Sequence, residues 1–451
     1  MEVLDNKNIV QYIKQEAIQN DINVNQGRTN SLFNQIERFM SQYKVKQIGL
    51  VNVVSRNLIY IVEDNSSKKI VVKIRRETPS LSLEEELFYL TILEKKYLKA
   101  KQLLSVQVAK NFTVTIEEFI DGLNIHQEIF TNSDYMDGLI KFTSKFNTIM
   151  FEKVENINDA LSNKKCFLHL LVSSWVEAAN DGFNGFLAQF ELNEKFNETE
   201  KDNKKDKYLL DNKSKVLKIK EFLEKTDFKQ LIISLTPSNF NNYLALSHID
   251  LHSGNLFLTK RGEKEVTGNS ETKGESDDQG EFQAIDFDDI SFNFIGYDLS
   301  HYIIEGFINE KYTKHPGYEF NAYKHMINDE QLLAVFDSYV DHFNRIVMIN
   351  QVEANNYRKH DFKLEKFTID DINKMFSITR LKGFLADCDS LNFEKIIKGE
   401  GVDYLFRATD ELSEHESYIR SLKSDYLKSQ SENLVKPEKS DQFGEFVYEP
   451  P

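Results

Sequence analysis

The N-terminal part of the chain changes from a helical to a strand pattern of hydrophobic positions. Up to about residue 45, apolar residues recur at helical spacing on either side of the turn-rich segment D-I-N-V-N-Q-G, as at Ile9, Ile13, Phe33 and Ile36. From Lys46 onward, short apolar stretches flank the hairpin signal D-N-S-S-K. We therefore predict two helices followed by antiparallel strands.

Most of the remaining chain has helical periodicity. Residues 81–97 carry a leucine stripe, two strands follow up to V-T-I-E-E-F-I-D-G, and helical patterns extend over 122–242 and 297–427. A chain of 451 residues is long for one core, so two lobes are expected. The prediction is an α+β fold with an N-lobe over 1–121 (leading helices, antiparallel sheet, one helix) and a helical C-lobe over 122–430.

Polar segments interrupt and end this pattern. The stretches near 191–216 and 259–280 are rich in charge or glycine and hold too few apolar residues to bury, so we expect flexible insertions there. Residues 431–451, which end in E-F-V-Y-E-P-P, are predicted to be a disordered tail.

Composition narrows the class of protein. The 56 basic and 72 acidic residues give a formal charge of −16, which argues against nucleic acid or an anionic membrane as the main partner. No apolar run reaches the length of a membrane span, and the start M-E-V-L-D-N-K-N does not resemble a secretion signal. The only cysteines, Cys166 and Cys388, lack partners at disulfide or zinc spacing. We expect a cytoplasmic protein without stable membrane insertion.

The stretch from Leu244 to Tyr302 contains the candidate catalytic and metal-binding residues. A short apolar strand leads into H-I-D-L-H-S-G-N, and a second strand, 282–285, delivers Asp286. Asp250 can accept the proton of an attacking hydroxyl, while Asn255 and Asp286 can hold Mg²⁺ against nucleotide phosphates. The alternative is that Asp250 and Asn255 cap a turn and Asp286 is a loop acid, but turn chemistry does not explain their joint spacing.

The predicted N-lobe offers groups for the nucleotide. Lys73 lies on one face of an alternating strand and can reach phosphates as a point charge. Glu86, on the helix predicted for 81–97, can pair with Lys73, although an acidic run favoured by the helix dipole explains Glu86 equally. Residues 117–122 read as an extended hinge whose backbone can bond an adenine.

These residues together resemble the choline/ethanolamine kinase family, a branch of the protein-kinase-like fold shared with aminoglycoside phosphotransferases. S-H-I-D-L-H-S-G-N resembles the family's H-N-D-x-x-x-x-N loop, and I-D-F-D-D-I-S-F-N-F-I-G-Y-D resembles its I-D-F-E-Y-x-x-x-N-x-x-G-x-D signature. The resemblance covers roughly Ile48 to Arg407. It implies a two-lobed kinase-like fold with a small antiparallel-sheet N-lobe and a large, mainly helical C-lobe.

The resemblance also implies a role for each matching residue. Asp250 is the catalytic base, and Asn255 and Asp286 are the Mg²⁺ ligands. The implied ATP-binding residues are Ser55, Asn57, Lys73, Glu86, Glu118, Phe119 and Ile120. The implied substrate-binding residues are His252, Asp288 and Glu305, of which Glu305 faces a cationic substrate unless it is a helix surface glutamate.

The chain departs from the family pattern at several positions. Val53-Val54 replaces a glycine-rich turn, and Ile249 replaces the asparagine beside the base. The family's W-G-L-W segment reads Lys382-Gly383-Phe384-Leu385, and Gly306 stands where a tryptophan is usual, so the aromatic cage for a quaternary ammonium is dismantled.

The sequence therefore predicts an ATP- and Mg²⁺-dependent small-molecule kinase that phosphorylates the hydroxyl of choline, ethanolamine or a related amino alcohol. One alternative is another hydroxyl substrate on the same fold, such as an aminoglycoside or sugar. A second alternative is a nucleotide-binding scaffold without turnover. The sequence does not decide between a monomer and a homodimer.

Overall fold

The computed structural model describes most of the chain up to residue 390. The described residues are 2–4, 8–52, 57–76, 83–197, 217, 219–238, 240, 242–259, 280–308, 323–353 and 363–390. Ser55, most of the two predicted insertions and the predicted tail lie outside them. The first residues of the 191–216 insertion belong to a helix that ends at Asn197.

The N-terminal sheet has six antiparallel strands in the order β1-β2-β3-β4-β6-β5. Their bounds are β1 (Glu2–Leu4), β2 (Val45–Asn52), β3 (Asn57–Asp64), β4 (Lys69–Arg75), β5 (Gln102–Ala109) and β6 (Phe112–Glu118). The hairpin between β3 and β4 closes on Asp64, whose Oδ1 accepts from the backbone N–H of Ser66 (2.8 Å) and Lys68 (2.9 Å). The predicted strands are confirmed, and β1 is an addition to them.

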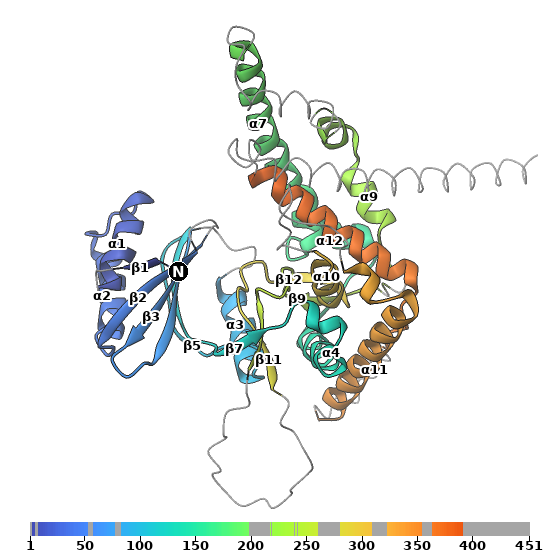
Figure 1. Ribbon diagram of the computed structural model, residues 1–451, viewed down its shortest axis with the longest axis horizontal. Helices are drawn as coiled ribbons and strands as arrows, with labels where there is room; N and C mark the ends of the chain where they lie inside the picture. Colours follow the sequence, from blue (N-terminus) through green and yellow to red (C-terminus); the bar gives the residue numbers. More distant parts are fainter. Residues whose placement is uncertain are drawn as a thin grey trace, which may run out of the picture.

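The predicted leading helices are confirmed as α1 (Ile9–Gln19) and α2 (Gly27–Met40). Their buried faces, including Ile13 and Phe33, form one apolar core with the sheet. Figure 1 shows both helices on the side of the sheet that faces away from the C-terminal helices. The predicted helix over 81–97 is α3 (Leu83–Lys95), which packs instead into the core of the C-terminal part through Leu90 and Leu93.

The C-terminal part is mainly helical, as predicted. Its helices are α4 (Ser133–Asn147), α5 (Ile157–Ser162), α6 (Phe167–Leu170), α7 (Val176–Asn197), α9 (Phe228–Ser234), α10 (Tyr297–Gly306), α11 (Asp329–Glu353) and α12 (Ile369–Ser390), with short turns η1 (Gln127–Phe130), η2 (Leu171–Trp175) and η3 (Lys324–Met326). α12 packs against α7 and α10, and α11 packs against α4 (Figure 1). Trp175 contacts the edge of this core, with its ring 5.8 Å from that of Phe167.

Two small antiparallel sheets lie between the N-terminal sheet and the helices. One has the order β11-β10-β7 and the other β12-β9-β8. Their strands are β7 (Gly122–Asn124), β8 (Phe151–Lys153), β9 (Tyr243–Ser247), β10 (Leu256–Thr259), β11 (Glu281–Ala284) and β12 (Ser291–Phe294). The sequence predicted only helix from 122 to 242, and this was wrong for β7 and β8, because strands of three residues leave no periodicity to detect.

β11 is tied to the segment that follows α3. The Ala284 N–H donates to the Leu98 carbonyl at 2.8 Å, and Lys99 pairs with Ala284 as an isolated parallel bridge. The end of β11 is therefore fixed beside the N-terminal sheet. Asp286 follows two residues after this end.

Candidate active site

A tight turn between β9 and β10 carries Asp250 and Asn255. The Asn255 backbone N–H donates to the His252 carbonyl at 2.9 Å, and its side-chain Nδ2 donates to the Asp250 carbonyl at 2.9 Å. A Cβ added at Gly254 would lie 2.7 Å from His252 Cε1, so a larger residue there would displace the His252 ring. The turn fixes the Asn255 amide with its nitrogen on the Asp250 side, which leaves Oδ1 as its acceptor atom.

Asp286 joins this turn through the backbone. The Ile285 N–H donates to the Asn255 carbonyl at 2.9 Å, so the residue before Asp286 is bonded to the predicted metal ligand on the other strand. β10 and β11 pair in antiparallel register up to Leu256 and Ala284, which brings both strand ends to the same place. The backbone therefore brings Asp250, Asn255 and Asp286 to the same strand ends, and their binding of one metal ion stays a prediction.

Two residues at the site have left-handed backbone conformations. Ile249 has φ of 72° and Asp286 has φ of 62°. Such a conformation costs a β-branched residue roughly 1–2 kcal/mol, whereas asparagine adopts it more easily. The surrounding hydrogen bonds and the complete burial of Ile249 hold this strained turn in place.

Asp298, at the start of α10, fixes the β9–β10 turn through hydrogen bonds. Its carboxylate oxygens accept from the backbone N–H groups of His248 and Ile249, both at 3.1 Å, and from Asn147 Nδ2 at 2.9 Å. Burial raises the pKa of Asp298, against the lowering effect of His248 and of these hydrogen bonds. The sequence assigned Asp298 no role, although its place in the I-D-F signature was the available signal.

Acidic residues of the 286–288 segment meet the basic residues of β4. Lys73 Nζ pairs with Asp286 Oδ1 and lies 2.8 Å from Asp288 Oδ1, while Asn57 Nδ2 donates to Asp288 Oδ2. Burial disfavours the charge on Lys73, but the two carboxylates outweigh it and raise its pKa. Burial likewise opposes ionisation of Asp288, yet Lys73 lowers its pKa. The sequence assigned Asp288 to the substrate; the structure places it among the groups predicted to bind the nucleotide.

The predicted Lys73–Glu86 ion pair is wrong. Glu86 instead makes a bidentate pair with Arg75, with Nη1–Oε1 at 2.7 Å and Nη2–Oε2 at 2.9 Å, and Arg75 Nη1 lies 3.5 Å from Asp288 Oδ1. Lys73 and Arg75 are two residues apart on β4 and therefore point to the same face of the sheet. The planar guanidinium matches the carboxylate better than an ammonium does, and Lys73 is left to the 286–288 segment.

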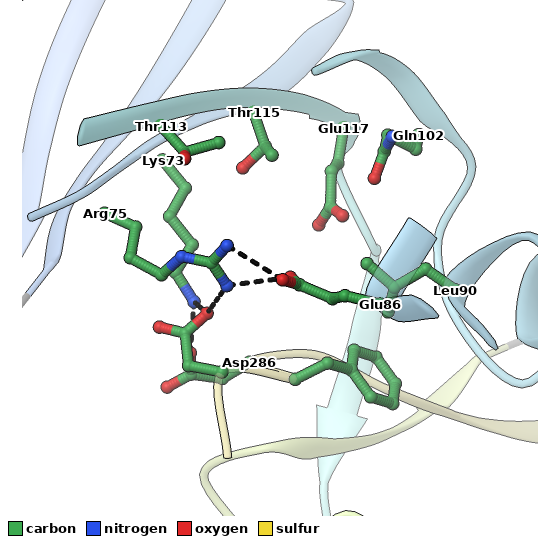
Figure 2. Close-up of a pocket in the computed structure, with 11 residues that line it drawn as sticks. Lys73, Arg75, Glu86, Leu90, Gln102, Thr113, Thr115, Glu117 and Asp286 are labelled. Carbon is green, nitrogen blue, oxygen red and sulfur yellow. Dashed lines mark hydrogen bonds and ion pairs between the residues drawn. The ribbon is translucent and has the colours of Figure 1, made fainter. Parts of the chain in front are cut away.

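These groups line a pocket between the sheet and the 286–288 segment. Figure 2 shows side chains from β4 and β6 above it, Glu86 and Leu90 of α3 at one side, and Asp286 below. Three buried polar atoms of lining residues, Arg75 Nε, Gln102 Oε1 and Thr113 Oγ1, have no hydrogen-bond partner among the described residues. Orphan polar atoms of this kind fit a pocket that takes a polar ligand or water.

The predicted adenine hinge follows β6. The Glu118 N–H donates to the Lys101 carbonyl at 2.9 Å, so this donor is engaged within the protein. Lys69 Nζ lies 5.2 Å from the centre of the Phe119 ring. The backbone N–H of Glu118 is therefore not available to an adenine.

Lys382 reaches Asp250 from α12, a contact the sequence did not predict. Its Nζ pairs with Asp250 Oδ1 and donates to the Ile249 carbonyl at 3.2 Å. Burial opposes the Asp250 charge, but Lys382, with smaller effects of His301 and His252, holds the pKa of Asp250 well below its usual range. No local signal could have revealed this contact, because the two residues lie far apart in sequence.

Of the other predicted substrate residues, His252 lies beside Asp250 and Glu305 lies beside His301. His252 Nε2 is 3.7 Å from Asp250 Oδ2, and Glu305 Oε1 is 3.9 Å from Nε2 of the buried His301, one turn earlier on α10. Burial and the Lys382 charge lower the pKa of His301, so this imidazole is neutral at pH 7. The Glu305 side chain is 34% exposed.

The described residues do not gather three or more His, Cys, Asp or Glu side chains into a metal cluster. Mg²⁺ does not require one, because it is usually bound by one or two carboxylates together with substrate phosphates and water. Asp286 and the Asn255 amide oxygen fit that donor set. Every helix within the described residues is too short or too polar to span a bilayer.

The N-terminal antiparallel sheet carries a lysine, and the helical lobe that follows presents an acid, an amide and a second acid at strand ends. This arrangement defines a two-lobed phosphotransferase of the protein-kinase-like fold. The chain belongs to the choline/ethanolamine kinase family, whose model matches residues 22–382. Members of this family are phosphotransferases with an alcohol acceptor.

Solved structures of similar fold include choline kinase from Cryptosporidium parvum Iowa II, at 14% identity and a TM-score of 0.48, with 86% of this chain and 93% of that chain covered. Plasmodium vivax ethanolamine kinase is similar at 14% identity and a TM-score of 0.46, covering 90% and 95%. The amicoumacin kinase hAmiN matches at 13% identity and 0.43, covering 86% and 95%. No curated protein sequence matches significantly.

Proposed function

We propose that this protein transfers the γ-phosphate of ATP to the hydroxyl of a small alcohol, with Asp250 as the catalytic base. The observation that supports this most strongly is the Ile285–Asn255 backbone bond, which gathers Asp250, Asn255 and Asp286 at the ends of two paired strands. Phosphoryl transfer needs mainly positioning and charge neutralisation, and these three groups supply both.

The nucleotide occupies the side of the site formed by β4 and the hinge. Lys73 binds phosphate oxygens, and Phe119 and Ile120 offer backbone groups to the adenine. Asp286 and Asn255 would hold Mg²⁺, which when bound neutralises phosphate charge. Lys73 pairs with both Asp286 and Asp288, which leaves one of its three N–H donors for a phosphate oxygen.

The acceptor binds on the α10 side of Asp250. Family membership points to an amino alcohol such as choline, ethanolamine or a related compound. Glu305 supports this class, because its partly exposed side chain lies one helical turn from His301 and carries a carboxylate that can pair with an ammonium. His252 approaches the same carboxylate of Asp250 and can contact the acceptor. The setting we propose is the cytoplasm.

A sugar hydroxyl is the second candidate acceptor. It is favoured by the Lys382–Asp250 pair, which places a positive charge beside the base before any acceptor arrives. A sugar needs no compensating negative charge at that position, whereas an amino alcohol brings a further positive charge.

An acceptor screen tests the reaction directly. ADP release is measured with Mg·ATP and choline, ethanolamine, sugars and aminoglycosides, for the wild type, Asp250→Asn and a control, Asp370→Asn, whose side chain is 66% exposed on α12. We expect at least one acceptor to raise ADP release, and Asp250→Asn to lower it about a hundredfold or more while the control does not. If no acceptor raises ADP release above that of Asp250→Asn, the proposed reaction is excluded.

A further inference from the structure

Lys382 is anchored at two points on the turn that carries the predicted base. The residue is 6% exposed, in the middle of α12, and its Nζ pairs with Asp250 Oδ1 and donates to the Ile249 carbonyl at 3.2 Å. Burial opposes the Lys382 charge, but Asp250, with smaller effects of Tyr297 and Asp289, outweighs burial and raises the pKa of Lys382. The ammonium is therefore charged at pH 7, and its charge is compensated within the protein.

One of these anchors lies on the strained part of the turn. Ile249 has φ of 72°, a conformation that is costly for a β-branched residue. Asp298 of α10 accepts the Ile249 N–H, and Lys382 of α12 donates to the Ile249 carbonyl, so two helices hold this residue at both ends. Asp250 follows directly in the chain. The position of its side chain therefore depends on both contacts.

The other anchor distinguishes the two oxygens of the Asp250 carboxylate. Oδ1 is engaged by Lys382, whereas the contacts of Oδ2 are longer, with Asn255 Nδ2 at 3.4 Å and His252 Nε2 at 3.7 Å. A charge-assisted hydrogen bond to one oxygen opposes rotation of the carboxylate about its Cβ–Cγ bond. Oδ2 is thus the oxygen that remains for a further partner.

We propose that Lys382 is a positioning residue for phosphoryl transfer: it holds Asp250 so that Oδ2, and not Oδ1, accepts the hydrogen of the acceptor hydroxyl. The inference rests on the proposed function, since it takes Asp250 as the group that this hydroxyl approaches. Lys382 acts through Asp250 and needs no contact with nucleotide or acceptor. Without the ammonium the carboxylate would rotate and the turn would relax, and a misplacement of about 1 Å typically costs about a hundredfold in rate.

A double-mutant cycle in the rate constant separates this role from a purely structural one. The kcat and the KM for ATP are measured for wild type, Lys382→Met, Asp250→Asn and the double variant, with the acceptor that gives the highest rate. Lys382→Met should lower kcat about thirtyfold to a hundredfold and change the KM for ATP less than about twofold. In the Asp250→Asn background the same change should lower kcat less than about threefold, because the carboxylate that Lys382 positions is already absent.

Further variants separate positioning from a folding defect. Lys382→Arg keeps a charged donor and should retain at least about five times the kcat of Lys382→Met. Lys374→Met, on the same helix but paired with the exposed Asp370, is the matched control and should behave as the wild type. If Lys382→Met is unfolded at the assay temperature, Lys382→Gln replaces it in the cycle.

Thermal unfolding of the same proteins tests the contact without turnover. The double variant should recover at least about half of the Tm that Lys382→Met loses, because no buried carboxylate is then left without its partner.

The inference is overturned if Lys382→Met keeps kcat within about threefold of the wild type, or if it lowers kcat by the same factor in both backgrounds, as a purely structural role predicts. Failure of the wild type to transfer phosphate to any acceptor counts against the proposed function instead. The thermal cycle then still decides whether Lys382 holds Asp250, and additive losses of Tm in the double variant would contradict it.

Discussion

At the residue scale, Asp371 shows how one carboxylate fixes the helix that carries Lys382. Thr368 and Asp371 form a capping box at the start of α12: the Asp371 N–H donates to Thr368 Oγ1 at 3.1 Å, and the Thr368 N–H donates to Asp371 Oδ2 at 2.9 Å. Ser238, far away in sequence, donates from its backbone N–H and its hydroxyl to the same carboxylate. Burial opposes the Asp371 charge, but these hydrogen bonds outweigh it and lower the pKa.

Replacing Asp371 by Asn should therefore destabilise the protein by about 1–2 kcal/mol at pH 7, because the amide satisfies fewer of these donors. A carboxyl whose pKa is lowered by folding stabilises the protein above its unfolded pKa of about 3.9 and loses that effect as the pH falls. The difference in unfolding free energy between wild type and Asp371→Asn should thus shrink below about pH 4. Urea unfolding across pH measures it, with Asp370→Asn as control; a difference that grows toward acid contradicts the assignment.

The Arg75–Glu86 ion pair is a second feature at the residue scale that affects stability. Both partners are buried. Arg75 is 7% exposed and Glu86 is 6% exposed. Removing one partner of a buried, bidentate pair leaves the other charge without compensation, which typically costs about 3–5 kcal/mol.

We predict that Arg75→Met loses about 3–5 kcal/mol of unfolding free energy, and that the double variant Arg75→Met with Glu86→Met recovers much of this loss. Arg75→Lys should be intermediate, because an ammonium cannot form the fork geometry. Denaturant unfolding of the wild type, Arg75→Met, Glu86→Met and the double variant measures the cycle. A double variant whose loss equals the sum of the two single losses would show that the pair has no coupling energy.

At the scale of elements, the β9–β10 turn depends on α10 for its shape. The Asp298 carboxylate accepts hydrogen bonds from the His248 and Ile249 backbone N–H groups. Tyr339 of α11 donates to Asn147 Oδ1 at 2.8 Å, and Asn147 in turn donates to Asp298. The strained Ile249 backbone persists because this network holds it. Asp298 is thus a positioning residue for Asp250.

Replacing Asp298 by Asn leaves one oxygen for two backbone donors. We expect the catalytic rate constant with the best acceptor to fall about a hundredfold through misplacement of Asp250, while the KM for ATP changes little. Stability should fall by about 1–3 kcal/mol for the unpaired N–H. Asp337→Asn on α11, whose partner is the 63% exposed Lys366, should change neither. A rise in the KM for ATP without loss of rate would place Asp298 on the nucleotide side instead.

The elements themselves could be predicted well where the pattern is long. α1, α2, α3 and the β3–β4 hairpin agree with the predicted helices and strands within a few residues, because each has clear periodicity or turn chemistry. β7, β8 and β12 were not predicted, since three or four residues fix no period, whereas the equally short β11 was found through the I-D-F motif that follows it. Short strands form because partners elsewhere in the chain offer hydrogen bonds, which is not local information.

At the scale of the whole molecule, the site joins two cores. Lys73 and Arg75 belong to the sheet, whose core includes α1 and α2, whereas Asp286 and Asp250 adjoin residues in the core of the helical lobe, such as Phe287 and Ile249. Their ion pairs across this boundary explain why the sequence located the site residues but mispaired them. Motif spacing predicted which groups converge, yet choosing Arg75 over Lys73 for Glu86, or bringing Lys382 to Asp250, depends on tertiary packing.

The central claim is that Asn255 and Asp286 bind one Mg²⁺ ion together with the phosphates of ATP. Calorimetric titration of ATP, with and without Mg²⁺, into the wild type, Asn255→Ala, Asp286→Asn and the double variant tests it most directly. Each single variant should lose the Mg²⁺-dependent gain in ATP affinity, and the double variant should lose little more, because both residues act on the same ion. Unchanged Mg²⁺ dependence in either single variant, or fully additive losses in the double variant, would contradict the account.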